Sequence, residues 1–429
     1  MKKQFGACGS VEHEVARRQF LGGMMAGSAG IGGLSSFTTQ EALAGLAKEQ
    51  KRMIVVRMAG GLSQLESWDP KPNTDTGGPF RAIPTSVPGT HICELLPYTA
   101  KQMHHLCVVR GINTHNGDHG KGTYMMLTGR HRAPGQTYPE LGAVVAKGMD
   151  DGTQSLPGHI KVSNGGSGGR NNDSAYLGPK YASISLGGGK PPAYTERPKN
   201  LTDASIARAN AFRKATNKHF SGKRRTAETE AYVQSFEQAQ ELVKRRDVFD
   251  LSKESKKDHE RYGPHDFGKH CLLARRLIEK GINYVQVEHS NYDTHNENFE
   301  FHFEQLGEFD RPFATLVNDL AERGLMKSTL IVVLSEFGRT PKINPRYGRD
   351  HWGTAWSVAL GGCGITPGAV FGKTNKNGTA VTDGQVDAGH LFHTYLKALG
   401  MNSRKSFKIG GQKIPVADPA FEPIKEILA

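Results

Sequence analysis

The chain has 429 residues, of which 37% are hydrophobic, and its formal net charge is +13. Its 52 glycines and 21 prolines indicate a globular, loop-rich protein of one large α/β domain with insertions, or of two domains, rather than a disordered or collagen-like chain. The basic residues are spread along the chain without a nucleic-acid-binding motif, and no run of about 18 apolar residues occurs, so neither nucleic-acid binding nor a transmembrane helix is expected.

The first 44 residues have the pattern of an export signal. Arg17 and Arg18 are adjacent, Phe20 and Leu21 follow, and a weakly apolar, Gly-rich stretch leads to Ala44. This arrangement is typical of a twin-arginine signal peptide that is cleaved after Ala44. The sequence therefore predicts export through the twin-arginine pathway to a periplasmic or extracellular location. The alternative is a chance arginine pair before a helix of small residues.

Five short apolar segments are predicted to be buried strands, with helical patterns between them. Residues 138–149 have helical spacing, and residues 267–281 and 304–324 are amphipathic and end in glycine, with Pro312 marking a new first turn. Strands that alternate with helices predict a parallel or mixed sheet with helices on both faces. The predicted strands are 53–58, 106–112, 282–288, 329–335 and 356–362.

Residues 150–262 are predicted to interrupt this alternation. Residues 150–200 are rich in Gly, Ser, Asn and Pro, which indicates long loops, and residues 200–262 are charged and helical with a weak core pattern. We therefore predict one domain over residues 45–429 with a loop-rich and helical insertion at about 150–262.

The cysteines suggest no zinc or redox motif. Outside the predicted signal they are widely spaced and form no CxxC pair. One disulfide and four buried thiols remain as alternatives in an exported protein. The residues concerned are Cys93, Cys107, Cys271 and Cys363.

Chargeable side chains follow four of the predicted strands. In open α/β sheets, ligands bind at the carboxyl ends of the strands. Segments that contain His, Asp, Glu or Gln follow the strands at 53–58, 106–112, 282–288 and 329–335, and "GRDHW" stands just before the last strand. Four separate segments thus bring these side chains to one edge of the sheet, which predicts a functional site there.

Two of these segments contain residues suited to a metal. Asp293 and His295 stand two residues apart in "YDTH", and a carboxylate with an imidazole suits zinc, manganese or iron. The alternative is a loop Asp in an Asx turn with an exposed His. His351 follows Asp350, which is expected either to orient that imidazole or to pair with Arg349.

A third segment, "THNGDH", supplies His115, Asp118 and His119. His115 and His119 are four residues apart and would share one face of a helix, but the glycines at 117 and 120 favour a loop. In the stretch that follows the strand at 329–335, Arg339 and Arg349 are expected either to hold an anionic group through paired hydrogen bonds or to form ion pairs. The expected ion-pair partners are Glu336 and Asp350.

Five motifs of the chain resemble one known family. They are "GGLSQLESWDPKP", "THNGDHGKGTYMMLTG", "YDTH", "SEFGRTPKIN" and "GRDHW", and they resemble domain-of-unknown-function family 1501, an exported bacterial family abundant in planctomycetes. That family is similar to the alkaline phosphatase and sulfatase superfamily. The resemblance implies a doubly wound, mostly parallel α/β sheet with a bimetal site at its carboxyl edge. It also implies hydrolysis of phosphate or sulfate esters through a Ser, Thr or formylglycine nucleophile.

Compared residue by residue, the chain departs from the superfamily pattern. Counting back from "LTGR" at 127–130 puts His119 at the nucleophile position, and the metal-binding Asp that usually ends the first strand is missing. Glu336 and Phe337 stand where the superfamily has an Asp-His pair. One metal site is therefore expected to be lost or remodelled. The residues that resemble the other site are Asp293, His295 and His351.

Two functions follow from this comparison. The first is a sulfatase-like, metal-dependent hydrolase of an anionic ester, either a small molecule or a polysaccharide. Its metal would be divalent, zinc in the first place, with manganese or calcium as alternatives. The metal ligands would be Asp293, His295, His351 and Glu336; His119 would be a nucleophile or a further ligand, His115 an acid or base, and Arg339, Arg349 and Gln64 would hold the substrate.

The second is a non-catalytic binding or assembly module of the cell envelope that keeps the fold. The absent nucleophile favours it, whereas the gathering of His and Asp at one edge favours the hydrolase, because unpaired charges there cost stability. The hydrolase hypothesis predicts that His119, Asp293, His295 and His351 converge within a few ångströms.

Overall fold

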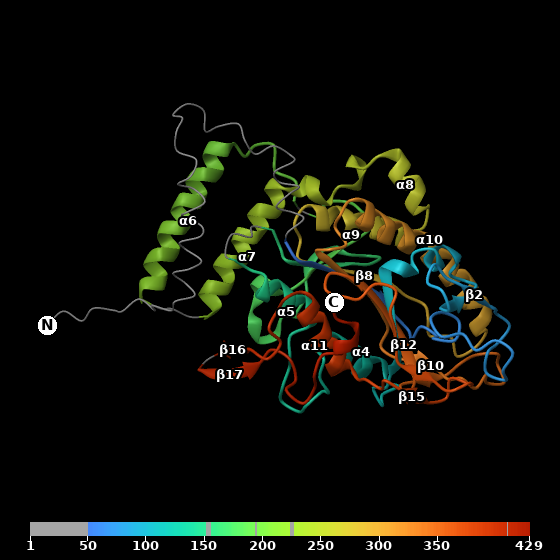
Figure 1. Ribbon diagram of the computed structural model, residues 1–429. Coiled ribbons are helices and arrows are strands. Elements are labelled where there is room, and N and C mark those ends of the chain that lie inside the picture. The colour runs from blue at the N-terminus through green and yellow to red at the C-terminus, as the bar shows by residue number, and fades with distance from the viewer. Residues whose placement is uncertain (1–49, 152–155, 194, 224–226, 410) are drawn as a thin grey trace, which may run out of the picture. The chain divides into compact units, whose positions relative to one another are not determined.

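The computed structural model describes residues 50–151, 156–193, 195–223, 227–409 and 411–429, so the predicted signal at 1–44 lies outside the described residues. Within these ranges, the central feature is a nine-stranded sheet with strand order β13-β4-β12-β9-β1-β8-β5-β7-β6 (Figure 1). β12 runs antiparallel to β4 and β9, and β6 runs antiparallel to β7, whereas the other neighbouring strands are parallel. The five predicted strands all belong to this sheet, and the prediction of a mostly parallel α/β fold is confirmed.

The strands of the sheet are β1 (Arg52–Met58), β4 (Leu106–Ile112), β5 (His159–Val162), β6 (Ser167–Arg170), β7 (Ile184–Leu186), β8 (Tyr284–His289), β9 (Thr329–Leu334), β12 (Trp356–Gly362) and β13 (Val370–Phe371). Four two-stranded ribbons accompany it: β2 (Ala82–Pro84) with β3 (His91–Cys93), β10 (Gly338–Arg339) with β11 (His351–Trp352), β14 (Lys373–Thr374) with β15 (Val381–Asp383), and β16 (Ser406–Ile409) with β17 (Gln412–Pro415).

Helices cover both faces of the sheet (Figure 1). The central strand β1 is apolar from Met53 to Val56 because both of its faces are buried there. Ile54 and Val56 face one core with α9 and α10, while Met53 and Val55 face the other core with α5 and α11. The helices are α3 (Pro97–Ala100), α4 (His119–Thr128), α5 (Leu141–Gly148), α6 (Asp203–Lys223), α7 (Ala227–Lys244), α8 (Lys256–Tyr262), α9 (Asp266–Glu279), α10 (Asn298–Glu322) and α11 (Ala388–Ala398).

Helix α10 differs from its prediction. It begins at Asn298 and continues through Pro312, which was expected to start a new helix. A proline inside a helix removes one backbone hydrogen bond and costs about 3 kcal/mol. Phe309 and Phe313 flank this position, are fully buried and stack with ring centroids 4.9 Å apart, so core packing holds the helix through the proline.

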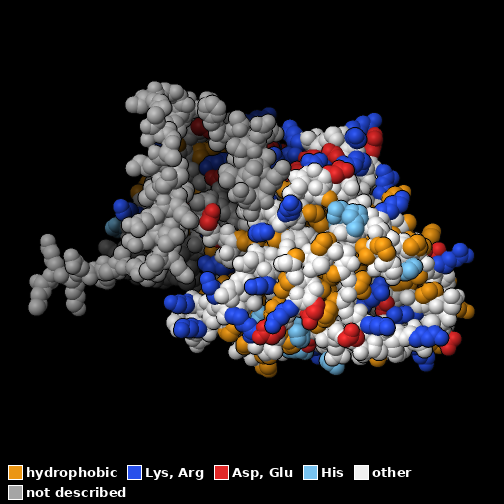
Figure 2. Space-filling model, in the orientation of Figure 1, with side chains coloured by type: hydrophobic (Ala, Val, Ile, Leu, Met, Phe, Trp, Pro, Cys, Tyr) orange, Lys and Arg blue, Asp and Glu red, His pale blue; other side chains and the backbone are white. Residues whose placement is uncertain are grey.

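The region from 200 to 262 contains α6, α7, α8 and short 3-10 turns, as its sequence suggests. The prediction of long loops over 150–200 is wrong in part, because β5, β6 and β7 lie there and extend the central sheet. The four cysteines outside the predicted signal are buried free thiols. No helix in the described part of the chain is both long enough and apolar enough to cross a membrane. Figure 2 shows Lys and Arg side chains scattered over the visible face among acidic and apolar ones.

Candidate metal centre

The strand order brings five distant segments to one edge of the sheet. β1, β4, β8 and β9 point the same way, so the loops that follow them leave from the same edge. β12 runs the opposite way and therefore begins at that edge, and β11 lies just before it in the chain. The loops after β4, β8 and β9, together with β11, carry His119, Asp293, Glu336 and His351 to neighbouring positions.

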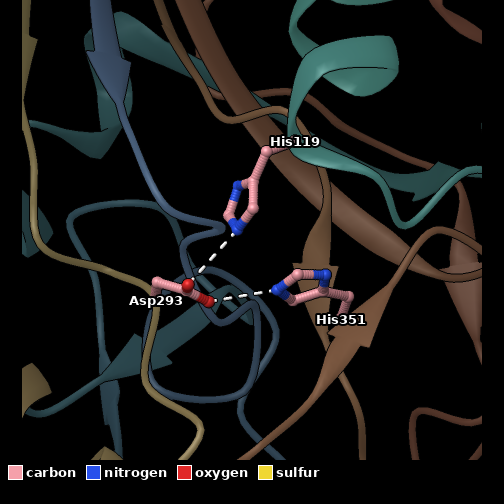
Figure 3. A group of neighbouring side chains, drawn as sticks. All are labelled: His119, Asp293 and His351. Carbon is pink, nitrogen blue, oxygen red and sulfur yellow. Dashed lines mark hydrogen bonds and ion pairs between the residues drawn. The ribbon is translucent and has the colours of Figure 1, made fainter.

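Three of these side chains form a cluster whose candidate ligand atoms all lie within 4.8 Å of one another: His119, Asp293 and His351. The Nε2 atom of His119 is 3.3 Å from Asp293 Oδ2, and the Nε2 atom of His351 is 3.0 Å from Asp293 Oδ1. Figure 3 shows both imidazoles pointing at the carboxylate from different elements.

His295 joins this cluster. Its Nε2 atom lies 3.0 Å from the Nε2 atom of His351 and 3.2 Å from Asp293 Oδ1. The structure therefore brings together the four residues that the hydrolase hypothesis requires to converge, with His119 beside Asp293 Oδ2 and the two other imidazoles beside Oδ1.

The opposite ring nitrogen of each imidazole has an acceptor as its partner. Carboxylate and carbonyl oxygens accept hydrogen bonds, so each Nδ1 atom donates and carries the ring proton. The Nε2 atom of each neutral ring then holds a lone pair, which is the form in which histidine binds metals. The partners of the Nδ1 atoms are Glu336 Oε1 for His119 at 2.9 Å, Asp350 Oδ1 for His295 at 2.7 Å, and the Gly117 carbonyl for His351 at 2.7 Å.

This protonation pattern fits a cation at the centre. Three Nε2 lone pairs and two carboxylate oxygens face one another at 3.0 to 3.3 Å, and acceptors at such distances repel unless a proton or a cation lies between them. Ligands about 2.1 Å from a tetrahedral zinc lie roughly 3.4 Å from one another, close to these distances. Imidazole with carboxylate is also a ligand set that divalent transition metals prefer.

Arg339 fixes the carboxylate of Asp293. Its buried guanidinium donates to Asp293 Oδ1 at 2.6 Å and to the carbonyl oxygens of Gly60 and Gly61. Burial acts to raise the pKa of Asp293, but the hydrogen bond and the positive charge of Arg339 outweigh it and hold that pKa below its usual range. Asp293 is therefore a carboxylate throughout the physiological pH range.

Glu336 is buried and links the loop after β1 to His119 at the start of α4. Its Oε1 atom accepts from the backbone N–H of Gly60 at 2.9 Å and from His119. Gly60 has φ +117, and a Cβ there would lie 2.6 Å from the backbone nitrogen of Asp293. A Cβ at Gly122, in the first turns of α4, would lie 2.7 Å from the carbonyl oxygen of Glu336. These glycines allow the backbones to approach closely enough for His119 to reach Glu336.

Three predicted site residues lie outside the cluster. Arg349 is fully buried and pairs with Glu66 at 2.8 Å, and Gln64 is buried and bonds the backbone of Arg339 at 2.8 and 3.0 Å, so both hold loops in place instead of facing a ligand as expected. His115 is exposed, with its backbone at φ 50. The segment containing His115 is a loop, as predicted, and α4 begins at His119.

Several hydrogen-bond and ion-pair partners at the metal centre were not predicted from the sequence. Asp350 was expected to orient His351, but it binds His295 instead. Arg57 lies 3.9 Å from a Glu336 oxygen and pairs with Glu288 at 2.7 Å. The signal that could have identified Arg57 is its charge inside an otherwise apolar strand, one residue before the strand's carboxyl end.

Several solved structures are similar to this chain. The PsFucS1 sulfatase from Pseudoalteromonas sp. is 13% identical, with 84% of this chain and 72% of that chain covered, at a TM-score of 0.39. The C-terminal periplasmic domain of EcEptC from Escherichia coli, in complex with Zn, is 9% identical, with 87% of this chain and 88% of that chain covered, at a TM-score of 0.40. The lipoteichoic acid synthase LtaP from Listeria monocytogenes is 10% identical, with 87% of this chain and 76% of that chain covered, at a TM-score of 0.36.

No curated protein matches the sequence. A family model described as "Protein of unknown function (DUF1501)" matches residues 50–428, which is most of the chain and includes every residue of the metal centre. The family predicted from the motifs is thereby confirmed, and the chain belongs to the DUF1501 family.

Proposed function

We propose that the protein is a metal-dependent hydrolase of sulfate or phosphate esters. The observation that supports this most strongly is the convergence of three imidazole Nε2 atoms on the Asp293 carboxylate. Asp293 Oδ1 and the Nε2 atoms of His295 and His351 form a triangle with sides of 3.0, 3.0 and 3.2 Å. In this proposal these three residues hold one divalent metal, zinc in the first place.

The charge of this ligand set favours an anionic substrate. One carboxylate and two neutral imidazoles leave a bound divalent ion with a net charge of +1, which attracts a sulfate or phosphate group. A bound zinc would supply a Lewis acid for the ester oxygens. Arg339 holds the carboxylate in place and so keeps Asp293 oriented toward the imidazoles.

His119 is the residue that acts on the substrate in this proposal. Its Nε2 atom lies 3.3 Å from Asp293 Oδ2, the carboxylate oxygen that is not part of the triangle, and in the neutral ring this atom can accept a proton from an attacking water. The buried carboxylate of Glu336 accepts a hydrogen bond from Nδ1–H of His119 and stabilises the imidazolium that forms when Nε2 takes up a proton. This makes the pair of Glu336 and His119 a base with a fixed orientation.

Turnover on a panel of sulfate and phosphate esters tests the function. The mature protein is compared with His119→Ala, with His351→Ala, and with His219→Ala as a control, since His219 is exposed on α6. We expect turnover by the wild type and the control, loss of turnover with retained metal in His119→Ala, and loss of both in His351→Ala. Bound metal without turnover of any ester would instead favour the non-catalytic module.

The predicted export belongs to the same proposal. A twin-arginine signal at 1–44 would deliver the folded, metal-loaded protein to a periplasmic or extracellular location. Secretion of a reporter fused to residues 1–44 in a twin-arginine-competent bacterium, abolished by replacing Arg17 and Arg18 with lysine, tests this.

A further inference from the structure

A second concave site lies beside the metal centre, at the carboxyl ends of β5 and β8. It encloses about 530 Å³ and is bordered by α9 and α10. Ser163 and Asn164 also border a hollow of about 290 Å³, and His265 and Glu308 also border another of about 510 Å³. We call these three adjoining hollows the long cleft, and their extent suits a chain-like ligand.

Among the described side chains, those that line the long cleft are apolar, uncharged polar or acidic. Among the described residues, none of those that line the three hollows is Lys or Arg, although the chain contains 55 of them. The lining instead presents hydroxyl, amide, imidazole and carboxylate groups. A chain of sulfated or phosphorylated units would meet the carboxylate of Glu308, whose contacts are the imidazoles of His265 and His289, whereas Glu288 is paired with Arg57.

His270 indicates that the cleft is built for a polar ligand. It lines the largest hollow, only 2% of its surface is exposed, and neither ring nitrogen has a well-aligned hydrogen-bond partner among the described residues, although the backbone of Glu288 is near. Burial lowers the pKa of His270, so the ring is neutral, with one donor and one acceptor. A sugar hydroxyl both donates and accepts, and would satisfy this ring.

Two further residues extend the same chemistry along the cleft. Glu308 lies between His265 and His289, with contacts of 3.3 and 3.7 Å, and its carboxylate accepts hydrogen bonds from hydroxyls. Phe303, one helical turn and a half before it on α10, is 65% exposed and lines the hollow that also contains Pro97. An exposed aromatic ring beside hydrogen-bonding groups presents an apolar face on which the C–H face of a sugar can lie.

We propose that the long cleft binds a chain of uncharged sugars, one unit of which carries the anionic ester into the metal centre. His289 and Asn291 line the cleft, and Asp293, two residues further on, belongs to the centre, so the loop after β8 contributes to both sites. The assignment of the ester to the centre rests on the proposed function, whereas the binding of sugars in the cleft does not.

Calorimetric titration of short oligosaccharides into the metal-loaded protein tests this proposal, with uncharged, sulfated and amino-sugar series. We expect the uncharged series to bind and the sulfated and amino-sugar series to bind more weakly at the cleft. His270→Leu removes the unpaired imidazole, so we expect a melting temperature equal to or above that of the wild type, together with a roughly tenfold loss of affinity. Phe303→Ala is expected to lose about fivefold.

Two controls make the result interpretable. Phe212→Ala removes a ring that is 76% exposed on α6, away from the cleft lining, and is expected to leave sugar affinity unchanged. His351→Ala removes the metal centre but should still bind uncharged sugars. A wild-type protein that binds these sugars and turns over no ester would refute the proposed function alone. Stronger binding of sulfated or amino-sugar chains, or unchanged affinity in His270→Leu, would overturn the proposal for the cleft.

Discussion

Replacing Glu336 with Gln tests the orientation of His119 at the centre. The substitution keeps the volume of a side chain that is only 2% exposed, and the amide oxygen can still accept from Gly60 at the observed 2.9 Å. What is lost is the charge that holds the Nδ1 proton of His119 and stabilises its imidazolium. Partners of this kind typically contribute 10- to 100-fold to activity or metal affinity, which is about 1.4 to 2.7 kcal/mol.

The assay separates metal binding from turnover. Because Asp293, His295 and His351 hold the metal in this account, Glu336→Gln should keep its bound metal while kcat/KM falls by about 10- to 100-fold. Bound metal is measured by mass spectrometry and turnover on the preferred ester, and Glu300→Gln, an exposed position on α10, is the matched control. Unchanged turnover in Glu336→Gln, or loss of metal with a normal melting temperature, would refute this role for the Glu336–His119 pair.

Three more predictions concern neighbouring residues. Glu66→Gln leaves the buried Arg349 without its counter-charge and should reduce the free energy of unfolding by about 3 to 5 kcal/mol in urea denaturation; a change below about 1 kcal/mol would contradict the role of this ion pair. The folded-state pKa of Asp293 is lowered, so its carboxylate stabilises the metal-free protein above about pH 4 and loses this effect as the pH falls further. Asp293→Asn should therefore be less stable than the wild type at neutral pH and approach it only in strong acid, and equal stability at both pH values would contradict this. His115→Ala should keep turnover within about twofold because His115 is exposed outside the cluster, and a tenfold loss would restore it as an acid or base.

Five of the nine strands, β1, β4, β8, β9 and β12, were predictable because each contains a buried apolar run. β9 is buried along its whole length, and β1 has the apolar run Met53–Val56, whereas the short strands β5, β6, β7 and β13 have no such run. The start of α10 was less predictable. Its N-terminal turn is anchored by Asn298, whose side chain donates to the distant Glu66, and sequence periodicity does not report such a contact.

The gathering of the site residues was also predictable, because parallel strands end at the same edge. The pairing within the site was not. Asp350 stands next to His351 in the sequence yet bonds Nδ1 of His295, 55 residues away, while His351 lies against Nε2 of the same ring. Glu66 and Arg349 are 283 residues apart, and only the folded loops show that this arginine is committed to an ion pair.

Anomalous diffraction at the zinc absorption edge, on crystals of the protein purified without added chelator, tests the central claim most directly. The account predicts one peak within about 2.1 Å of Asp293 Oδ1 and of the Nε2 atoms of His295 and His351. It also predicts that the Nδ1 atoms of His295 and His351 keep their partners, Asp350 and the Gly117 carbonyl. A metal bound elsewhere, or a centre that stays free of metal when the crystals are soaked in zinc, manganese or calcium, would contradict it.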